Sequence, residues 1–289
     1  MAKVLLGMSG GVDSSTAAAL LMRAGHEVIG ATLVMHDIHE KDAAAAKDVA
    51  DAIGIPHHTV DMREDFESFV LSPFVSEYEN GRTPNPCVIC NGYIKFPGLI
   101  RLADRLGCEY IATGHYCDIL HDGDTHYLLK AKDQNKDQTY FLNQLSQAQL
   151  DKVLFPLGKL DKSEVRRIAE KNGLATAEKK DSTGICFIGE RNFRNFLQNY
   201  IPNKKGKIMT YDGKVLGEHL GLMYYTIGQR RGLGIGGQAG DDGSRWFVIE
   251  KDLKNKILEL TKNEEYEEIV KILTEISNNS SNEYLYFIS

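Results

Sequence analysis

The chain has 289 residues, of which 42% are hydrophobic and 26% charged, and its formal net charge is −6. At roughly 150 residues per domain, this length predicts about two domains, each able to bury a core. The acidic balance argues against a generic nucleic-acid coat, but it is compatible with a local basic patch. No secretory signal is seen, and the first apolar run, VLLGM, is too short to span a bilayer. We therefore expect a cytoplasmic protein that is not bound to a membrane.

The first half of the chain alternates strand-like and helix-like segments. Gly25 and Gly54 close two Ala-rich helices, and a long amphipathic segment occupies residues 63–80. The strand-like segments are residues 3–8, 26–35, 56–62 and 108–116, and the helix-like segments are 14–25, 40–54 and 96–107. Parallel strands that alternate with helices need crossover connections, so the predicted fold class is α/β with a doubly wound parallel sheet.

The second half of the sequence changes from a mostly helical pattern to a mostly strand-like one. A hairpin is expected at 117–131, a helix from 137 to the break at Pro156, and a further helix at 190–201. Residues 161–173 form a strongly predicted helix, because Asp161 and Glu164 make a capping box and a glycine ends it. After Pro202 the sequence becomes glycine-rich, with a hairpin at 207–219. We expect a catalytic domain at 1–195, a small β-rich domain at 196–255 and a short tail at 256–289.

The string GMSGGVDSS, residues 7–15, follows the first strand and opens the first helix. Paired glycines let the backbone approach a ligand closely, and the amides of a helix N-terminus bind anions. It is not a Walker motif, because no Gly-Lys-Ser/Thr follows. Its place at the carboxyl edge of the predicted sheet is where open α/β folds bind ligands. The string therefore predicts a phosphate-binding loop.

The five cysteines are an odd number, which in a reducing compartment points to catalytic, metal-binding or packing roles. Cys87 and Cys90 form a Cys-x-x-Cys pair behind two prolines, so we expect them in or beside a shaped loop, with Lys95 near enough in sequence to lower a thiol pKa. A structural zinc site would need a second pair of ligands, which is not seen. Cys186 lies between Gly184 and a short apolar run, and by itself this segment favours a buried packing cysteine over a reactive one. Cys108 and Cys117 flank an apolar strand and are interpreted as packing residues.

Taken together, six motifs in order resemble the tRNA-specific 2-thiouridylases, a family within the ATP pyrophosphatases. The resemblance runs from residue 3 to about 252, and its motifs are SGGVDSS, TPNPC-x-x-CN-x-x-IKF, ATGHY, KDQTYFL, DSTGICFIG and TIGQRRGLGI. Members of this family use ATP to replace the 2-oxygen of the wobble uridine with sulfur in the tRNAs for Glu, Gln and Lys. Other enzymes with the pyrophosphatase loop share only the first motif.

The resemblance implies a set of roles for residues of this chain. Cys186 would carry a persulfide, and Cys90 would be the second catalytic thiol, able to close a disulfide with Cys186 after sulfur delivery. Lys179, Lys180 and Arg191 flank Cys186 and would favour its thiolate. The residues implied to bind ATP, with magnesium near Asp13, are Gly7, Met8, Ser9, Gly10, Gly11, Val12, Asp13, Ser14, Leu33 and Gly114. The residues implied to face the target base or the tRNA are Asn85, Pro86, Cys87, Lys136, Asp137 and Gln138.

Partners also follow from the resemblance. The anticodon loop of tRNA would be the substrate, since extruding a base from a loop costs less than flipping one from a duplex. A cysteine desulfurase or a sulfur-relay protein would supply the persulfide. Basic residues after Pro202, at Lys204, Lys205 and Lys207 and at Arg230 and Arg231, are interpreted either as phosphate contacts or as an ordinary solvated surface.

Two departures from the family pattern leave alternatives open. Many relatives have aspartate at the position of Cys87, so an acid–base role there is in doubt. A cysteine instead allows an iron–sulfur cluster held by Cys87, Cys90 and Cys186. Relatives usually continue into a β-barrel that grips tRNA, whereas the last residues here show no barrel pattern. A non-catalytic tRNA-binding paralogue is the alternative from another class, and the retained phosphate loop and cysteines argue against it.

Overall fold

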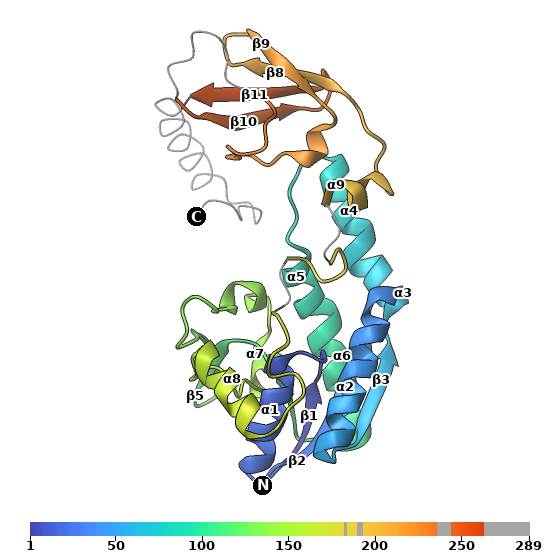
Figure 1. Ribbon diagram of the computed structural model, residues 1–289, viewed down its shortest axis with the longest axis vertical. Helices are drawn as coiled ribbons and strands as arrows, with labels where there is room; N and C mark the ends of the chain where they lie inside the picture. The colour runs from blue at the N-terminus through green and yellow to red at the C-terminus, as the bar shows by residue number, and fades with distance from the viewer. Residues whose placement is uncertain (182–183, 190–192, 236–243, 263–289) are drawn as a thin grey trace. The chain divides into compact units, whose positions relative to one another are not determined.

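The computed structural model describes residues 1–181, 184–189, 193–235 and 244–262. The chain divides into two compact units, which are described separately. The first unit comprises Met1–Phe74 and Asn85–Arg191, and the second comprises Val75–Pro84 and Asn192–Ser289. Figure 1 shows the chain coloured from its N-terminus to its C-terminus.

A five-stranded parallel sheet forms the centre of the first unit. Its strands are β1 (Lys3–Gly7), β2 (Glu27–Val34), β3 (His57–Asp61), β4 (Tyr110–Thr113) and β7 (Val153–Leu154), in the order β3-β2-β1-β4-β7. All four strand pairs are parallel, with Leu5 of β1 opposite Ile29 of β2 and Ile111 of β4. The predicted α/β fold with a parallel sheet is confirmed. Because β1 is central, the chain proceeds outward from it first on one side and then on the other.

Helices cover both faces of this sheet. The helices of the unit are α1 (Val12–Arg23), α2 (Glu40–Ile53), α3 (Arg63–Phe66), α5 (Pro86–Ile89), α6 (Phe96–Leu106), α7 (Gln147–Asp151) and α8 (Lys162–Lys171). Alanines of α1 and α2 share a buried cluster with Val4 and Leu6 of β1. The alternate side chains of β1 face α6, where Gly7 gives room: a Cβ there would lie 3.0 Å from Leu99. Burial on both faces explains why β1 and β2 are almost continuously apolar.

Two predicted helical or loop regions are corrected by the structure. Residues 137–158 do not form one helix: a 3₁₀ turn (Thr139–Leu142) comes first, Ser146 and Gln149 then make a capping box that starts α7, and Val153 joins the sheet as an edge strand beside β4. The cap and the strand pairing override the helical pattern. The Cys87–Cys90 segment is helical, with α5 running into a π-helical turn (Cys90–Lys95) and then into α6.

The remaining elements of the first unit connect these layers. A 3₁₀ turn (Asp37–His39) precedes α2, a π-helical turn (Glu67–Leu71) follows α3, and α4 (Ser72–Glu79) continues into the second unit. The predicted hairpin is present as β5 (Cys117–Asp122) and β6 (Thr125–Lys130), with Gly123 at φ 57° in its turn. The predicted capping box of α8, between Asp161 and Glu164, is also present.

The second unit is mostly β, as expected. Its sheet has the order β10-β11-β8-β9, formed by β8 (Gly206–Thr210), β9 (Val215–His219), β10 (Trp246–Asp252) and β11 (Ile257–Lys262). α9 (Phe193–Gln198) and a 3₁₀ turn (Leu222–Tyr224) complete the described elements. Its core contains Ile208, Val248 and Leu258. Residues 257–262, assigned to a tail from the sequence, form an inner strand here, and residues 263–289 lie outside the described part.

Candidate active site

The loop between β1 and α1 has the geometry of an anion cradle. Gly10 adopts φ 66°, and a Cβ there would lie 2.8 Å from the carbonyl oxygen of Asp42, so only glycine fits. Gly11 is the N-cap of α1, and its carbonyl oxygen accepts bonds from Ser14 Oγ and Ser15 Oγ at 3.2 and 2.9 Å. Ser9 N donates to Ser14 Oγ at 3.2 Å, and the amides of the first helical turn, which have no partner within the helix, are the groups that can bind an anion.

The end of β4 approaches this loop closely. A Cβ at Gly114 would lie 2.9 Å from the backbone nitrogen of Ser14 and 3.0 Å from the carbonyl carbon of Asp13. Because α1 follows β1 on one face and α6 precedes β4 on the other, the crevice between β1 and β4 is the topological switch point of the sheet. Gly114 keeps the backbone of β4 against α1 at the place where this class of fold binds ligands.

Three of the predicted nucleotide-binding residues contribute their side chains to the core. Met8 and Val12 are each 3% exposed, and Leu33 is 9% exposed. Met8 donates its backbone amide to Ala31 O at 2.7 Å, and its carbonyl accepts from Thr32 Oγ1 at 2.8 Å. Their side chains fix the position of the loop, while the exposed Ser9 and the backbone amides are the groups open to a ligand.

Asp13, in the first turn of α1, is the start of a charged network. Lys162 Nζ lies 2.6 and 2.8 Å from the two carboxylate oxygens of Asp13, and Tyr116 Oη donates to Asp13 at 2.8 Å. The same Lys162 Nζ lies 2.9 Å from Asp181, so one ammonium bridges two carboxylates that are 168 positions apart in the chain. Burial and the carboxylate of Asp13 raise the pKa of Tyr116 well above its usual range, so its hydroxyl remains a donor at neutral pH.

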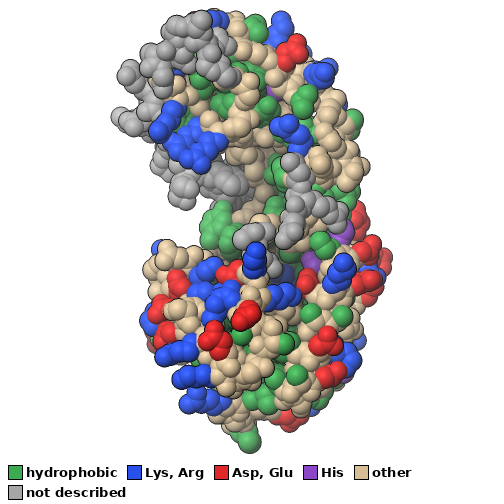
Figure 2. Space-filling model, viewed as in Figure 1, with side chains coloured by type: hydrophobic (Ala, Val, Ile, Leu, Met, Phe, Trp, Pro, Cys, Tyr) green, Lys and Arg blue, Asp and Glu red, His purple; other side chains and the backbone are tan. Residues whose placement is uncertain are grey.

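Asp181 forms ion pairs with three cations. Lys136, Lys162 and Arg166 lie 2.8, 2.9 and 2.7 Å from its carboxylate. Although burial acts to raise its pKa, hydrogen bonds from Lys136 and Lys162 lower it to about 2. Nearby, Lys179 Nζ donates to Gly10 O at 2.9 Å. Lys and Arg side chains interleaved with Asp and Glu cover this side of the first unit, over α8 and its neighbours (Figure 2).

Lys136, Asp137 and Gln138, which were predicted to contact tRNA, help to hold the charged network around Asp181 in place. Lys136 pairs with Asp181, as described. Asp137 accepts from Ala131 N at 2.7 Å and from Thr139 Oγ1 at 2.5 Å. Gln138 exchanges bonds with the backbone of Tyr116, at 2.9 and 2.8 Å. Two of the three side chains therefore hold the chain in place around Tyr116, and Lys136 is the exposed cation among them.

The cysteine pair lies on a capped helix. Asn85 is the N-cap of α5 and accepts from Cys87 N at 3.2 Å, while Pro86 occupies the first turn, where its missing N–H costs nothing. Cys87 is half-buried, and Cys90 is 4% exposed with its Sγ 3.5 Å from Met35 Sδ. All five cysteines are free thiols.

One half-buried cation, Lys95, lies near the thiols. Burial acts to lower the pKa of Lys95, but thiolate character at Cys90, Cys186 and Cys87 raises it, so Lys95 stays an ammonium. In the reverse direction, burial raises the pKa of Cys90 to about 11, and Lys95 opposes that rise. Burial likewise raises the pKa of Cys87. The three cysteines therefore share one electrostatic environment, and Lys95 is its positive charge.

Cys186 itself is exposed, but the residue after it is anchored. Phe187 is 2% exposed, and its ring centroid lies 5.2 Å from that of Phe66 and 5.4 Å from that of Phe74, both edge-on. The buried aromatic thus presents a solvent-accessible thiol at a fixed place. Of the cations expected beside Cys186, Lys179 bonds to the phosphate loop instead, and Arg191 lies outside the described residues.

The thiol cluster does not have the geometry of a single metal site. Among the described residues, Cys87, Cys90 and Cys186 do not come together as the ligands of a single metal ion would, whereas three thiolates on one tetrahedral ion lie at metal–sulfur distances of about 2.3 Å. The donor set, three sulfurs with one cation, fits thiol chemistry best.

Sequence reasoning missed Lys162, Tyr116 and Asp181. Lys162 is the first residue of α8, where a cation opposes the helix dipole and an acidic residue is favoured. A cation at this position is therefore a local signal that Lys162 has a role outside the helix. The half-buried His115, whose pKa desolvation and Lys95 lower to about 3, is neutral and stacks against Phe96 with centroids 5.9 Å apart. Within the described ranges, no helix is long and apolar enough to cross a membrane.

Known proteins resemble this chain over most of its length. A family model for the tRNA methyl transferase HUP domain matches residues 2–190, and one for the tRNA methyl transferase PRC-barrel domain matches residues 194–261. The tRNA-specific 2-thiouridylase MnmA of Streptococcus pyogenes serotype M2 is 55% identical over 268 residues, which are 89% of this chain and 71% of that protein. The corresponding protein of Streptococcus mutans serotype c is 54% identical with the same coverage. Among solved structures, a 4-thiouridine synthetase–RNA complex with bound ATP gives a TM-score of 0.45 at 17% identity, covering 70% of this chain and 50% of that one.

Proposed function

The chain belongs to the tRNA-specific 2-thiouridylase family, and from this premise we propose that it is an ATP-dependent tRNA sulfurtransferase acting at C2 of the wobble uridine in the tRNAs for Glu, Gln and Lys. The observation that carries the proposal is that one unit holds both the phosphate-binding loop and the reactive thiols. Lys162 links the phosphate loop to Asp181, and the segment that follows Asp181 presents Cys186 beside the Lys95 thiol cluster.

ATP would be held at the switch point. The amides of residues 10–14 at the N-terminus of α1 receive its phosphates, and Gly114 lets the end of β4 pack against α1 to form the wall of the crevice. Asp13 offers hard oxygen ligands of the kind that magnesium prefers, and the ion would neutralise the phosphates when bound. Lys162 is released from Asp13 to a phosphate oxygen in that state, while Asp181 retains Lys136 and Arg166.

The first chemical step is adenylation. The uridine 2-oxygen attacks the α-phosphorus of ATP, and pyrophosphate leaves with the electron pair of the broken P–O bond. This converts a poor leaving group at C2 into AMP, which departs in the next step. Cations around the phosphate loop, Lys162 and Lys179, stabilise the charge that develops on the phosphates.

The second step transfers sulfur from a persulfide on Cys186. Its terminal sulfur attacks C2 and AMP leaves, which joins the base to Cys186 through an S–S bond. The Cys90 thiolate then attacks Cys186 Sγ, so that a Cys90–Cys186 disulfide forms and the 2-thiouridine leaves with the electron pair of the broken bond. A cellular dithiol restores the two thiols. Burial raises the pKa of Cys90 to about 11, so this attack requires loss of the Cys90 proton, and Lys95 offsets part of that rise.

Cys87 has a different part in this scheme. Because burial raises its pKa, it is a neutral thiol near pH 7 and a poor general base. We assign it, with the capped Asn85–Pro86 turn, to the wall that faces the target base. The anticodon loop of tRNA is the proposed substrate, and a cysteine desulfurase or a sulfur-relay protein is the proposed persulfide donor.

The test is reconstitution with ATP, magnesium, a persulfide donor and unmodified tRNA, followed by measurement of 2-thiouridine. The wild type should thiolate the tRNA. Cys186→Ser should abolish thiolation while tRNA-dependent pyrophosphate release persists. Release of pyrophosphate without any thiolation by the wild type would contradict the sulfur-transfer assignment, and neither activity would indicate a non-catalytic tRNA-binding protein.

Anaerobic purification with iron and sulfide analysis separates the persulfide route from the cluster route. The convergence of Cys87, Cys90 and Cys186 around one site is the observation that keeps an iron–sulfur cluster as the second candidate. A colourless and iron-free enzyme that is active supports the persulfide route. Activity that depends on stoichiometric iron and sulfide would replace it.

A further inference from the structure

Three metal-ligand side chains converge outside the thiol site, where the β5–β6 hairpin meets α7. His121 and His126 stand directly opposite each other across the hairpin, with their Nδ1 atoms 2.8 Å apart. Asp151, the last residue of α7, places Oδ1 3.4 Å from Nε2 of His126. The three residues each offer a ligand atom within 4.8 Å of the others, and no other such trio occurs in the part of the chain that is described.

The scaffold beneath this group is fixed by main-chain contacts. Gln147 accepts from His126 N at 2.7 Å and donates to His126 O at 2.9 Å, which ties the hairpin to α7. The His126 side chain is 10% exposed, whereas Asp151 is 65% exposed. One imidazole is therefore held in place by the fold, and the site remains open to solvent on its carboxylate side.

The contacts also indicate which nitrogen is free to bind. The carboxylate of Asp151, with its Oδ1 3.4 Å from Nε2 of His126, electrostatically favours the tautomer with its proton on Nε2. The lone pair on Nδ1 of His126 then faces Nδ1 of His121. In the metal-free molecule a proton on His121 Nδ1 fills this gap, and it moves to Nε2 of the same ring when a cation takes its place.

From this geometry we propose that His121 and His126 bind a divalent transition-metal ion through their Nδ1 atoms, with Asp151 orienting His126 and able to turn in as a third ligand. At metal–nitrogen distances of about 2.0 Å, two nitrogens 2.8 Å apart span an angle of about 90° at the metal. This angle fits tetragonal or octahedral coordination better than tetrahedral. Imidazole and carboxylate ligands in that arrangement select Ni²⁺ or Cu²⁺, and a tetrahedral ion such as Zn²⁺ requires the rings to move apart.

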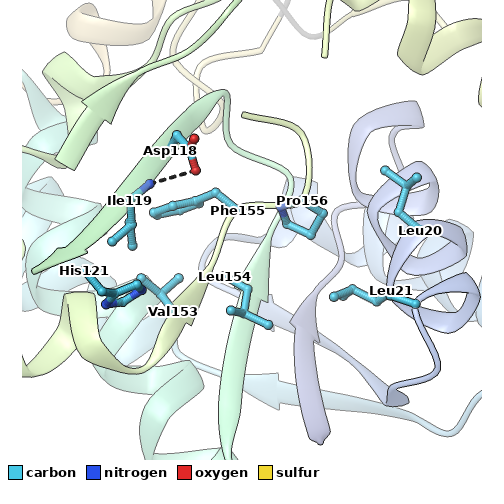
Figure 3. Close-up of a pocket in the computed structure, with 10 residues that line it drawn as sticks. Leu20, Leu21, Asp118, Ile119, His121, Val153, Leu154, Phe155 and Pro156 are labelled. Carbon is cyan, nitrogen blue, oxygen red and sulfur yellow. Dashed lines mark hydrogen bonds between the residues drawn. The ribbon is translucent and has the colours of Figure 1, made fainter. Parts of the chain in front are cut away.

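The position of the site gives the ion a structural consequence. Asp151 lies two residues before β7, and the close-up in Figure 3 shows His121 beside Val153 at the margin of a pocket of about 360 Å³. A metal held between the hairpin and α7 would pin the two-stranded β5–β6 sheet to the edge of the main sheet. Two-stranded sheets are only marginally stable by themselves, so the ion would reduce opening of the hairpin.

The test uses Ni²⁺ and the full-length protein in isothermal titration calorimetry. Ni²⁺ is preferred over Cu²⁺ because it does not oxidise the free thiols. We expect one ion per chain. His121→Ala should weaken binding at least about tenfold, and Asp151→Asn about tenfold while one-to-one binding is retained. Equal affinity in the wild type and His121→Ala, or no binding by the wild type at millimolar Ni²⁺, would overturn the proposal.

Controls separate this site from the other ligands of the chain. His58→Ala removes an exposed imidazole elsewhere and should leave the affinity unchanged. Cys186→Ser should also bind as the wild type does, and loss of binding there would assign the ion to the thiols. His126→Ala is checked by circular dichroism because its ring is largely buried, while the exposed His121 supplies a variant that is expected to fold. Hydrogen exchange in β5 and β6 should slow on Ni²⁺ addition in the wild type only.

Discussion

Replacing Asp181 with asparagine removes the charge that organises the cations beside the phosphate loop. Lys136, Lys162 and Arg166 all lie within 2.9 Å of this carboxylate, and together they hold its pKa at about 2 instead of the ordinary 3.8. At about 1.36 kcal/mol for each pKa unit, the difference corresponds to about 2.4 kcal/mol of folding free energy. Because the side chain is 26% exposed, solvent screening reduces this, and we expect a loss of about 1 to 2 kcal/mol.

The sign of the pH dependence follows from the lowered pKa. An acid that is more acidic in the folded state stabilises the fold at every pH above its unfolded pKa, near 3.9. That contribution disappears as the pH falls from about 4 to about 2. The Asp181→Asn variant should therefore be less stable than the wild type at pH 7, and the difference should shrink steadily below pH 4.

Urea denaturation at pH 7 and at pH 3 measures both quantities. The matched control is Asp104→Asn, which breaks an exposed pair with Lys152 at 3.1 Å and should cost no more than about 0.5 kcal/mol. If Asp181→Asn and Asp104→Asn lowered the free energy of unfolding equally at pH 7, the three-cation network would not stabilise the fold. A difference from the wild type that was the same at pH 3 as at pH 7 would show that the lost interaction is not the ionised carboxylate.

Three further predictions test other parts of the molecule. Lys95→Met removes the cation beside the thiols. In a Cys186→Ser background, alkylation of Cys90 should slow about tenfold at a fixed pH, as followed by mass spectrometry. An unchanged rate would exclude Lys95 as the stabilising charge. Gly114→Ala places a Cβ 2.9 Å from the backbone of α1, so ATP affinity by equilibrium dialysis should fall at least about tenfold, with circular dichroism reporting a retained fold, and wild-type affinity would refute the switch-point site. Burial lowers the pKa of Lys251 to about 8, and its Nζ has no hydrogen-bond partner among the described residues. The free energy of unfolding should therefore rise between pH 8 and pH 10, because the folded state loses this proton first. Lys251→Met should be about 1 kcal/mol more stable at pH 7 and should lack that rise.

The local features of the first unit could be predicted from the sequence because each depends on neighbouring residues. Two glycines after an apolar run give the turn and the helix start at residues 7–15, whatever packs around them. The capping box at Asp161 and the Asp122–Gly123 turn are equally local, and both are found. Alternation of strands and helices also determined the class of sheet.

Contacts between distant segments were decided only by the tertiary structure. Lys162 becomes part of the site because α8 packs on α1, and no local rule places its ammonium between Asp13 and Asp181. The segment at 137–158 has a helical pattern, yet pairing with β4 draws Val153 into the sheet. Strand pairing and charge compensation act between residues far apart in the chain, so their outcome depends on the folded packing. The sequence by itself determined which residues can react, and the fold decided which cation lies beside each of them.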